Sequence, residues 1–125
     1  MFTIEKRVEY IKNSNIKDDL KSAFITELKR LEYESRERAK LVEQYFTSRG
    51  FGRNIEGDET DENYLRISAM SNDGSKVIRA TMYWDDFNYA MTFDLETQKK
   101  FLENALVQAF QQLEDNNVNN YKRNR

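Results

Sequence analysis

The feature that most constrains the fold is an alternation of apolar residues that agrees on both sides of a tight turn. The turn is the segment Asn-Asp-Gly-Ser at residues 72–75, where Asp-Gly favours the positive φ of a two-residue hairpin loop. Because a slip of one residue would turn every side chain to the opposite face, the pairing register is strongly specified. Folding about this turn opposes only apolar pairs: Ala69 and Ile78, Ile67 and Ala80, Leu65 and Met82.

A second turn, at Asp85 and Asp86, predicts a third strand. The strand between the two turns then places the same apolar side chains against the strand before it and the strand after it. This agreement predicts a three-stranded antiparallel meander over residues 64–93. Residues 51–56 are a candidate for a short fourth strand at the edge. The pairs that the second turn opposes are Trp84 and Phe87, Met82 and Tyr89, Ala80 and Met91, Ile78 and Phe93.

Two segments with helical periodicity precede the meander. The first predicts a short helix with Thr3 as its N-cap, ending at the polar segment Asn-Ser-Asn. The second predicts a helix over residues 16–49, with Ser14 or Asn15 as its N-cap and Gly50 as the residue that closes it. At 1.5 Å per residue this helix is roughly 50 Å long.

The middle of the predicted long helix is polar on all sides. Residues 32–40 include Glu32 and Arg36 at i,i+4 spacing, which supports an exposed helix. Such a segment either breaks into a turn near residues 33–36 or projects and packs against a second copy of the chain. We favour the continuous helix and a homodimer contact through it.

A closing helix follows the meander, with Asp94 as its N-cap. Its apolar face is broad enough to cover one face of the sheet. The segment over residues 116–125 is rich in Asn and basic at its end, which predicts a disordered tail. The residues of the apolar face are Phe101, Leu102, Ala105, Leu106, Ala109, Phe110 and Leu113.

These elements predict one α+β domain over residues 1–115, in which helical segments, the second long, precede a three- to four-stranded antiparallel meander and a closing helix covers one sheet face. A chain of 125 residues is long enough for one hydrophobic core. No run approaches the roughly 18 apolar residues of a membrane span, and the first residues lack the pattern of a signal peptide. We therefore expect a cytoplasmic protein without a membrane contact.

The composition removes most catalytic chemistry. The chain has no Cys and no His, which excludes thiolate nucleophiles, imidazole bases and the metal sites that use these ligands. Asp85 and Asp86 form a carboxylate pair, but the predicted turn accounts for both. No phosphate-binding loop or metal-ligand spacing is present. We expect no enzymatic activity, no cofactor and no metal.

The second face of the predicted meander is the first candidate site. The same two turns place Tyr64 beside Tyr83 and Asn88, and they bring Arg66 and Arg79 onto the same exposed surface. An antiparallel sheet often carries one wet face for solubility alone. Arginine beside aromatic rings is also typical of surfaces that anchor a protein or stack a base. Both interpretations remain open at this point.

Nucleic acid is the second candidate partner. The order of helix, three antiparallel strands and helix resembles the double-stranded-RNA-binding domain over about half of the chain, and the resemblance implies phosphate contacts from Lys99 and Lys100. Glu96 and Glu103 lie close to this lysine pair, and the first hairpin loop is short and lacks the histidine of that family. These departures favour a plain solvated helix start. The basic residues of the tail that add charge are Lys122, Arg123 and Arg125.

The function that the sequence favours is binding. We expect a homodimeric interaction protein that binds, and inhibits, another macromolecule through Tyr64, Arg66, Arg79, Tyr83 and Asn88. The alternative is nucleic-acid binding through the same face and the tail. A net charge of −2 gives the chain no global basic field. Small, Asn-rich chains without proline resemble the accessory proteins of phages and mobile elements.

Overall fold

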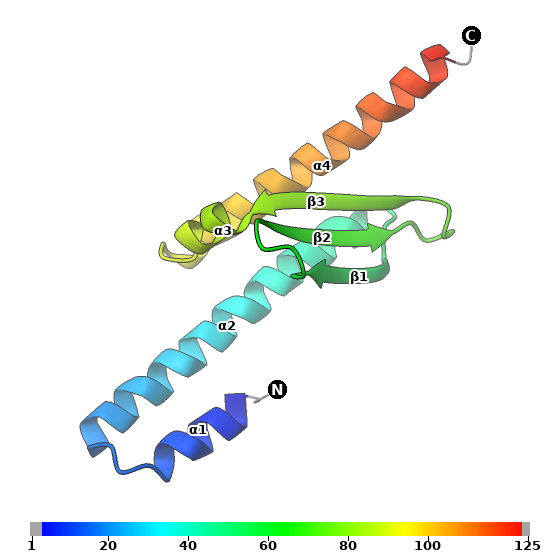
Figure 1. Cartoon of the computed structure of the whole chain (residues 1–125). Helices are drawn as coiled ribbons and strands as arrows, with labels where there is room; N and C mark the ends of the chain where they lie inside the picture. Colours follow the sequence, from blue (N-terminus) through cyan, green and yellow to red (C-terminus); the bar gives the residue numbers. More distant parts are fainter. Residues whose placement is uncertain (1–3, 124–125) are drawn as a thin grey trace. The chain divides into compact units, whose positions relative to one another are not determined.

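The computed structural model describes the backbone of residues 4–123 and the side chains of residues 5–114. Figure 1 shows the order of the elements: two helices, three strands and two further helices. The fold is α+β, as the sequence predicted. The chain divides into two compact units, Met1–Glu37 and Arg38–Arg125, and each is described by itself. The predicted single domain over residues 1–115 stays a prediction.

The first unit contains α1 (Ile4–Lys12) and the beginning of α2 (Asp18–Ser48). The predicted N-cap, Thr3, lies outside the described residues. Ser14 Oγ donates to the carbonyl of Ile11 at 2.7 Å, so Ser14 belongs to the end of α1. The prediction that Ser14 or Asn15 caps the second helix is therefore wrong. That helix starts later, at Asp18, with two carboxylates in its first turn that suit the helix dipole.

α2 is continuous over its 31 residues, which settles the choice between helix and turn at residues 33–38 in favour of helix. At 1.5 Å per residue, α2 is about 46 Å long. The predicted ion pair between Glu32 and Arg36 is present. Arg30 pairs with both Glu27 and Glu34, so charged i,i+3 and i,i+4 contacts support the polar stretch.

The end of α2 confirms the predicted role of Gly50. Gly50 has a φ of +84°, and its amide donates to the carbonyl of Thr47 at 3.2 Å. The amide of Phe51 donates to the carbonyl of Phe46 at 2.9 Å. Together these bonds form a Schellman motif, and the two positions of its usual apolar contact are held by Phe46 and Phe51, both buried in the core. The motif turns the chain directly from α2 into the sheet.

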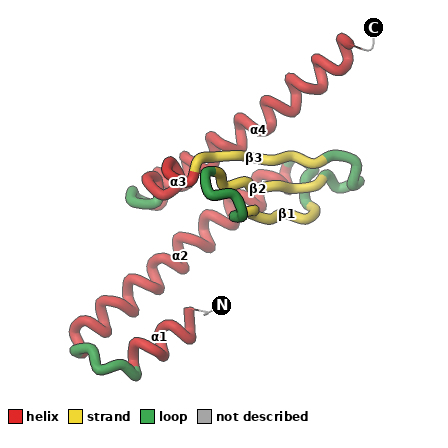
Figure 2. The backbone as a smooth tube through the Cα atoms, in the orientation of Figure 1, coloured by secondary structure: helices red, strands yellow, loops and turns green. Residues whose placement is uncertain are grey.

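The sheet has three antiparallel strands in the order β1 (Arg53–Asp58), β2 (Tyr64–Met70) and β3 (Val77–Tyr83), shown in Figure 2. The candidate edge strand is therefore present as β1. The register of β2 and β3 is the predicted one, with Leu65 opposite Met82 and Ala69 opposite Ile78. The connecting turn differs from the prediction, because among its residues only Gly74 has a positive φ. Its amide donates to the carbonyl of Ser71 at 2.9 Å.

The third strand of the predicted meander does not form. The helix α3 (Trp84–Ala90) occupies this segment, and Asp85 and Asp86 lie in its first turn instead of in a hairpin loop. The segment also carries apolar residues at a helical spacing of three, beginning with Trp84 and Phe87, and α3 packs these against the core. Tyr89, which belongs to the alternating set, is 68% exposed. The ring of Phe87 lies 5.6 Å from that of Trp84 and 6.5 Å from that of Phe101. The cross-strand pairs predicted from the second turn therefore do not form, and Trp84 and Phe87 meet instead as neighbours on one helix.

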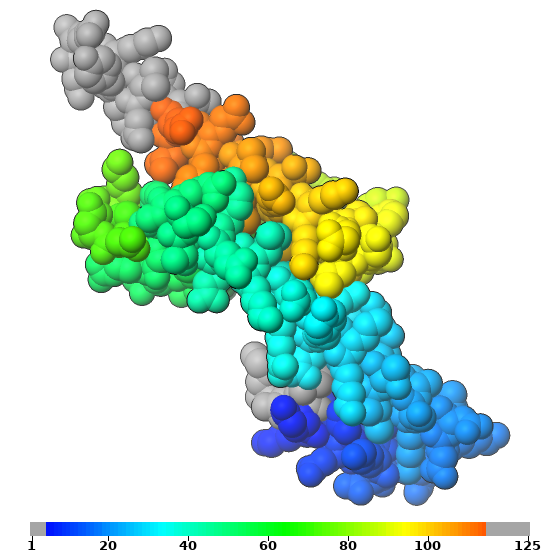
Figure 3. Space-filling view, turned by 180° about the vertical axis from the view of Figure 1, so that it is seen from behind, coloured from blue at the N-terminus to red at the C-terminus, as the bar shows by residue number. Residues whose placement is uncertain are grey.

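α4 (Leu95–Arg123) covers one face of the sheet. Asp94 caps it as predicted, because its Oδ1 accepts the amide of Thr97 at 3.1 Å. Seen from behind, α4 and the end of α2 over residues 38–48 lie side by side and hide most of the sheet (Figure 3). The buried core residues are Val42, Phe46, Phe51, Leu65, Ala69, Ile78, Ala80, Met82, Leu102, Leu106 and Ala109.

The backbone of α4 is helical as far as Arg123, so helix occupies most of the segment predicted as a disordered tail. The side chains of residues 115–125 lie outside the described residues. Over the part of the chain that the structure describes, no helix combines the length and apolar character needed to cross a bilayer.

Candidate functional site

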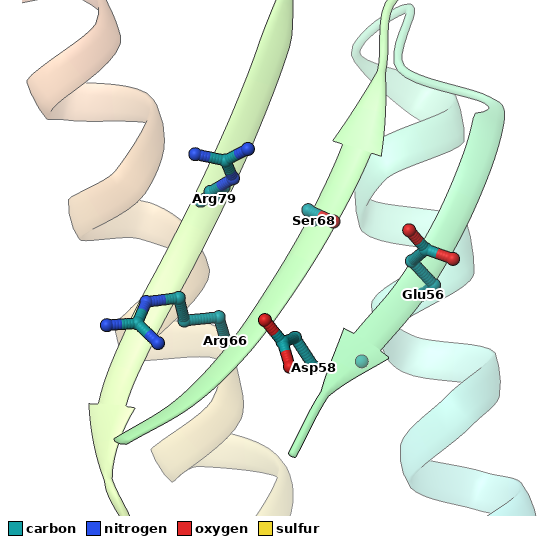
Figure 4. A pocket seen from close by; sticks show the side chains of 6 residues that line it. Glu56, Asp58, Arg66, Ser68 and Arg79 are labelled. Atoms are coloured by element: carbon teal, nitrogen blue, oxygen red, sulfur yellow. The ribbon is translucent and has the colours of Figure 1, made fainter. Parts of the chain in front are cut away.

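The candidate site is the face of the sheet opposite α4, which we call the polar sheet face. Its side chains come from all three strands, and Figure 4 shows the central ones. They line an open hollow of about 520 Å³ formed by Glu56, Gly57, Asp58, Arg66, Ser68 and Arg79. Tyr64 and Tyr83 lie at the end of β2 and β3 next to this hollow. We define the polar sheet face by these eight residues.

Strand register places the central residues together. Arg66 lies opposite Thr81 on β3, and Ser68 lies opposite Arg79, as the sequence predicted. On the other side, Asp58 pairs with Arg66 and Glu56 pairs with Ser68.

A tyrosine pair forms one end of the face. The ring centroids of Tyr64 and Tyr83 are 4.8 Å apart with an interplanar angle of 34°, and their hydroxyl oxygens are 3.5 Å apart. This contact raises the pKa of Tyr64 above its usual value, because the hydroxyl hydrogen bond with Tyr83 favours the neutral form. The guanidinium carbon of Arg66 lies 5.5 Å from the ring centroid of Tyr64. Arg66 and the two rings thus form a connected aromatic and cationic surface.

Asp61, in the loop before β2, holds this end of the face in place. Its Oδ1 accepts the amide of Asn63 at 2.8 Å, its Oδ2 lies 3.3 Å from the Nη2 of Arg66, and its carbonyl accepts the indole N–H of Trp84 at 3.0 Å. The backbone hydrogen bond from Asn63 lowers the pKa of Asp61, and the bond to Arg66 adds to this effect. Sequence reasoning missed Asp61, although the spacing Asp-x-Asn is typical of an Asx turn.

Charge is unevenly distributed over the polar sheet face. Arg66 and Arg79 stand on β2 and β3, whereas Glu56 and Asp58 stand on β1 (Figure 4). Hydrogen bonds from Thr60 are the main cause of the lowered pKa of Asp58, and the positive charges of Arg66 and Arg79 contribute. The face therefore has a basic side and an acidic side instead of a uniform field.

The remaining residues that the sequence predicted as site residues lie elsewhere. Asn88 is on α3 and not on the sheet, because the segment that carries it is helical. Lys99 and Lys100 belong to the first turns of α4, outside the polar sheet face. The side chains of Lys122 and Arg123 and the whole of Arg125 lie outside the described residues.

A second hollow, of about 390 Å³, lies between α3 and α4. Tyr89, Phe93 and Phe101 contribute to its lining, and the rings of Tyr89 and Phe93 meet edge to face at 5.0 Å. Asp86 and Lys100 are charged residues of the same lining. Sequence reasoning missed this hollow because residues 87–93 were predicted as a strand.

Among the side chains that the structure describes, no three carboxylates lie close enough together to hold a metal ion. The arrangement on the polar sheet face is suited to recognition, because it offers hydrogen-bond donors, acceptors and aromatic surface side by side. Comparisons of the chain with protein-family models, with curated proteins and with solved structures find no match.

Proposed function

We propose that this chain is a non-enzymatic interaction protein that binds another protein through the polar sheet face. The observation that supports the proposal is the grouping of Tyr64, Arg66, Arg79 and Tyr83 on one exposed surface. Tyrosine and arginine dominate the energetics of protein interfaces, because both bury large contact areas and keep polar groups for hydrogen bonds. These side chains stand on two paired strands of the sheet.

The charge distribution favours a protein partner over nucleic acid. Arg66 already pairs with Asp61, and the carboxylates of Glu56 and Asp58 lie on the same face. A phosphate backbone approaching this face would meet both carboxylates, whereas a protein surface can present complementary charges to each side. Nucleic-acid binding remains the second candidate, favoured by the stacked pair of Tyr64 and Tyr83, which resembles a platform for a single-stranded base.

We further propose that the chain is a homodimer through α2. Leu20, Phe24 and Leu31 follow one side of this helix, and each is about half exposed. Apolar side chains exposed along one helix face mark a contact surface. Inhibition of the bound partner, a cytoplasmic location and a role as a phage or mobile-element accessory protein stay predictions that belong to the same proposal.

The test is a pull-down from extract of the native host, with the tagged wild-type chain compared with the double variant Arg66→Ala, Arg79→Ala. We expect a protein that the wild type captures and the double variant loses, because the variant removes both cations and leaves the fold intact. Lys99→Ala with Lys100→Ala is the matched control, since it removes two cations outside the face. A captured protein that the double variant retains excludes the polar sheet face as the binding surface.

The salt dependence of capture distinguishes a protein partner from a nucleic-acid partner. Capture of a protein should change little between about 0.1 M and 0.5 M salt, whereas phosphate contacts release counterions and weaken steeply over that range. If nucleic acid is captured instead and salt removes it, the second candidate function replaces the first.

A further inference from the structure

The outer edge of β3 is a regular sheet edge. β3 is the last strand in the sheet order, and within the described residues no strand pairs with its outer side. It pairs with β2 over seven consecutive residues without a bulge and contains no proline. Long regular edges of this kind are rare in isolated domains, because they offer free backbone groups to any extended chain.

The opposite edge of the same sheet is protected. The register of β1 shifts between Arg53 and Glu56, and Asn54 within this irregularity has a φ of +51°. β1 also carries the carboxylates of Glu56 and Asp58. Bulges and charges are the common means by which a sheet edge is made unsuitable for pairing. β3 has no bulge and a single charged side chain, Arg79, so it is the more suitable of the two edges for an added strand.

The hydrogen bonds to β2 show which residues of β3 face this edge. Ser71 donates its amide to the carbonyl of Lys76 at 2.9 Å, and Trp84 donates its amide to the carbonyl of Asn63 at 3.0 Å. Because the N–H and C=O of one strand residue point to the same side and successive residues alternate, the even-numbered residues of β3 bond to β2. The residues whose N–H and C=O face the open edge are Val77, Arg79, Thr81 and Tyr83.

These four residues also direct their side chains to the polar sheet face, and all four are exposed. Arg79 lies in the middle of the strand, and Arg66 lies near it on β2 (Figure 4). An added strand with an acidic side chain opposite Arg79 meets positive charge on this side of the face. The same strand at the β1 edge would meet Glu56 and Asp58.

We propose that the β3 edge binds an extended acidic segment of the partner protein as a fourth strand. The inference rests on the proposed protein-binding function and names the part of the partner that is recognised. Main-chain hydrogen bonds to the edge supply affinity, and alternate side chains supply specificity. The segment carries an acidic residue opposite Arg79 and apolar residues at the alternate positions opposite Val77 and Tyr83.

The experiment selects random displayed peptides, about twelve residues long, against the full chain. We expect enriched peptides with a carboxylate flanked at alternate positions by β-branched or aromatic residues. Thr81→Pro removes one edge N–H and no bond to β2, so proline is compatible with the fold at this position. It should lower the affinity of these peptides by about tenfold or more. Thr81→Val is the control, because it changes the side chain and keeps the N–H.

A charge reversal tests the sequence preference. The variant Arg79→Glu should enrich peptides with lysine or arginine at the position where the wild type enriches a carboxylate. Absence of enriched peptides, or peptides whose binding Thr81→Pro leaves unchanged, overturns the proposal.

Amide hydrogen exchange of the wild type gives an independent readout if Thr81→Pro does not fold. In the free chain the amides of Val77, Arg79, Thr81 and Tyr83 should exchange faster than those of their even-numbered neighbours, and a selected peptide should slow only the first set. Protection of these amides that rises with protein concentration, without peptide, identifies a second copy as the occupant and overturns the proposal.

The two proposals fail in different ways. Peptides that Thr81→Pro loses but the variant Arg66→Ala, Arg79→Ala retains support strand addition at the edge and contradict both the acidic preference at Arg79 and recognition by the side chains of the face. Peptides that still bind Thr81→Pro but no longer bind the variant Arg66→Ala, Arg79→Ala support recognition by the side chains of the face and contradict strand addition.

Discussion

Arg38 on α2 donates from Nη1 to the Oε1 of Gln98 on α4 at 2.6 Å, which links two helices of the second unit through a buried amide. Gln98 is only 1% exposed, and its Nε2 donates to the carbonyl of Phe93 at 2.9 Å. One side chain thus joins α2, α4 and the segment that follows α3. A buried amide with both ends bonded favours a single packing arrangement, because every alternative leaves polar atoms without partners.

We predict that Gln98→Ala lowers the free energy of unfolding by about 2–3 kcal/mol, since it removes these bonds and leaves a small cavity. Chemical denaturation followed by circular dichroism measures the change. Gln108→Ala on the exposed side of α4 is the matched control and should stay within about 0.5 kcal/mol of the wild type. Equal effects of the two substitutions would show that the buried bonds contribute nothing.

Gly50→Ala should destabilise the chain by about 1–2 kcal/mol, because an alanine is strained at the positive φ that the Schellman motif requires. A Cβ atom at Gly50 meets nothing within 4 Å, so the loss comes from the backbone and not from a clash. Gly50→Asn should lose less stability than Gly50→Ala, since asparagine tolerates a positive φ better than alanine does. Thermal unfolding of both variants tests the order, and an asparagine variant less stable than the alanine variant contradicts it.

Acid should weaken the hairpin turn between β2 and β3. The Oδ1 of Asp73 accepts hydrogen bonds from Ser71 Oγ at 2.7 Å and from the amide and Oγ of Ser75 at 3.0 and 2.7 Å, and these bonds, those from Ser75 first, hold the pKa of Asp73 well below its usual range. A lowered pKa in the folded state means that the stabilisation is complete above the usual aspartate pKa of about 4 and is lost as the pH falls through the folded value.

The measurement is the melting temperature at about pH 6 and about pH 3. The melting temperature of the wild type should fall more on acidification than that of Asp73→Asn, because the variant has no carboxylate at position 73 to protonate. Glu103→Gln, at an exposed position of α4, is the control and should follow the wild type. An Asp73→Asn variant with the full acid dependence assigns the effect to other carboxylates.

The hairpin of β2 and β3 could be predicted from the sequence because apolar residues alternate on both sides of one turn, and each side fixes the register of the other. Residues 84–93 lack that redundancy. Their apolar positions fit a strand at a spacing of two and a helix at a spacing of three, so the pattern alone does not decide between them. In the structure the helix is supported by tertiary contacts such as that of Phe87 with Phe101 of α4. Asn88 was misplaced for the same reason.

The acidic side of the candidate site could not be predicted, because it depends on a bulge. Glu56 and Asp58 reach the polar sheet face only through the register shift that follows Arg53, where Asn54 takes a positive φ. An Asn residue in a polar segment does not by itself specify such a shift. Tyr64, Arg66, Arg79 and Tyr83 were placed together correctly because they belong to the two strands whose register the turn defines.

Leu31→Asp should convert the proposed homodimer into monomers. Leu31 is 48% exposed on the same side of α2 as Leu20 and Phe24, and a carboxylate there has no counter-charge in an apolar contact. We expect the dissociation constant of the dimer to rise by about a hundredfold or more, measured by sedimentation equilibrium. Ser22→Asp, at an exposed position on the opposite side of α2, is the control and should leave the dimer intact. A wild-type chain that stays monomeric at every concentration, or a Leu31→Asp variant that remains dimeric, excludes α2 as the contact.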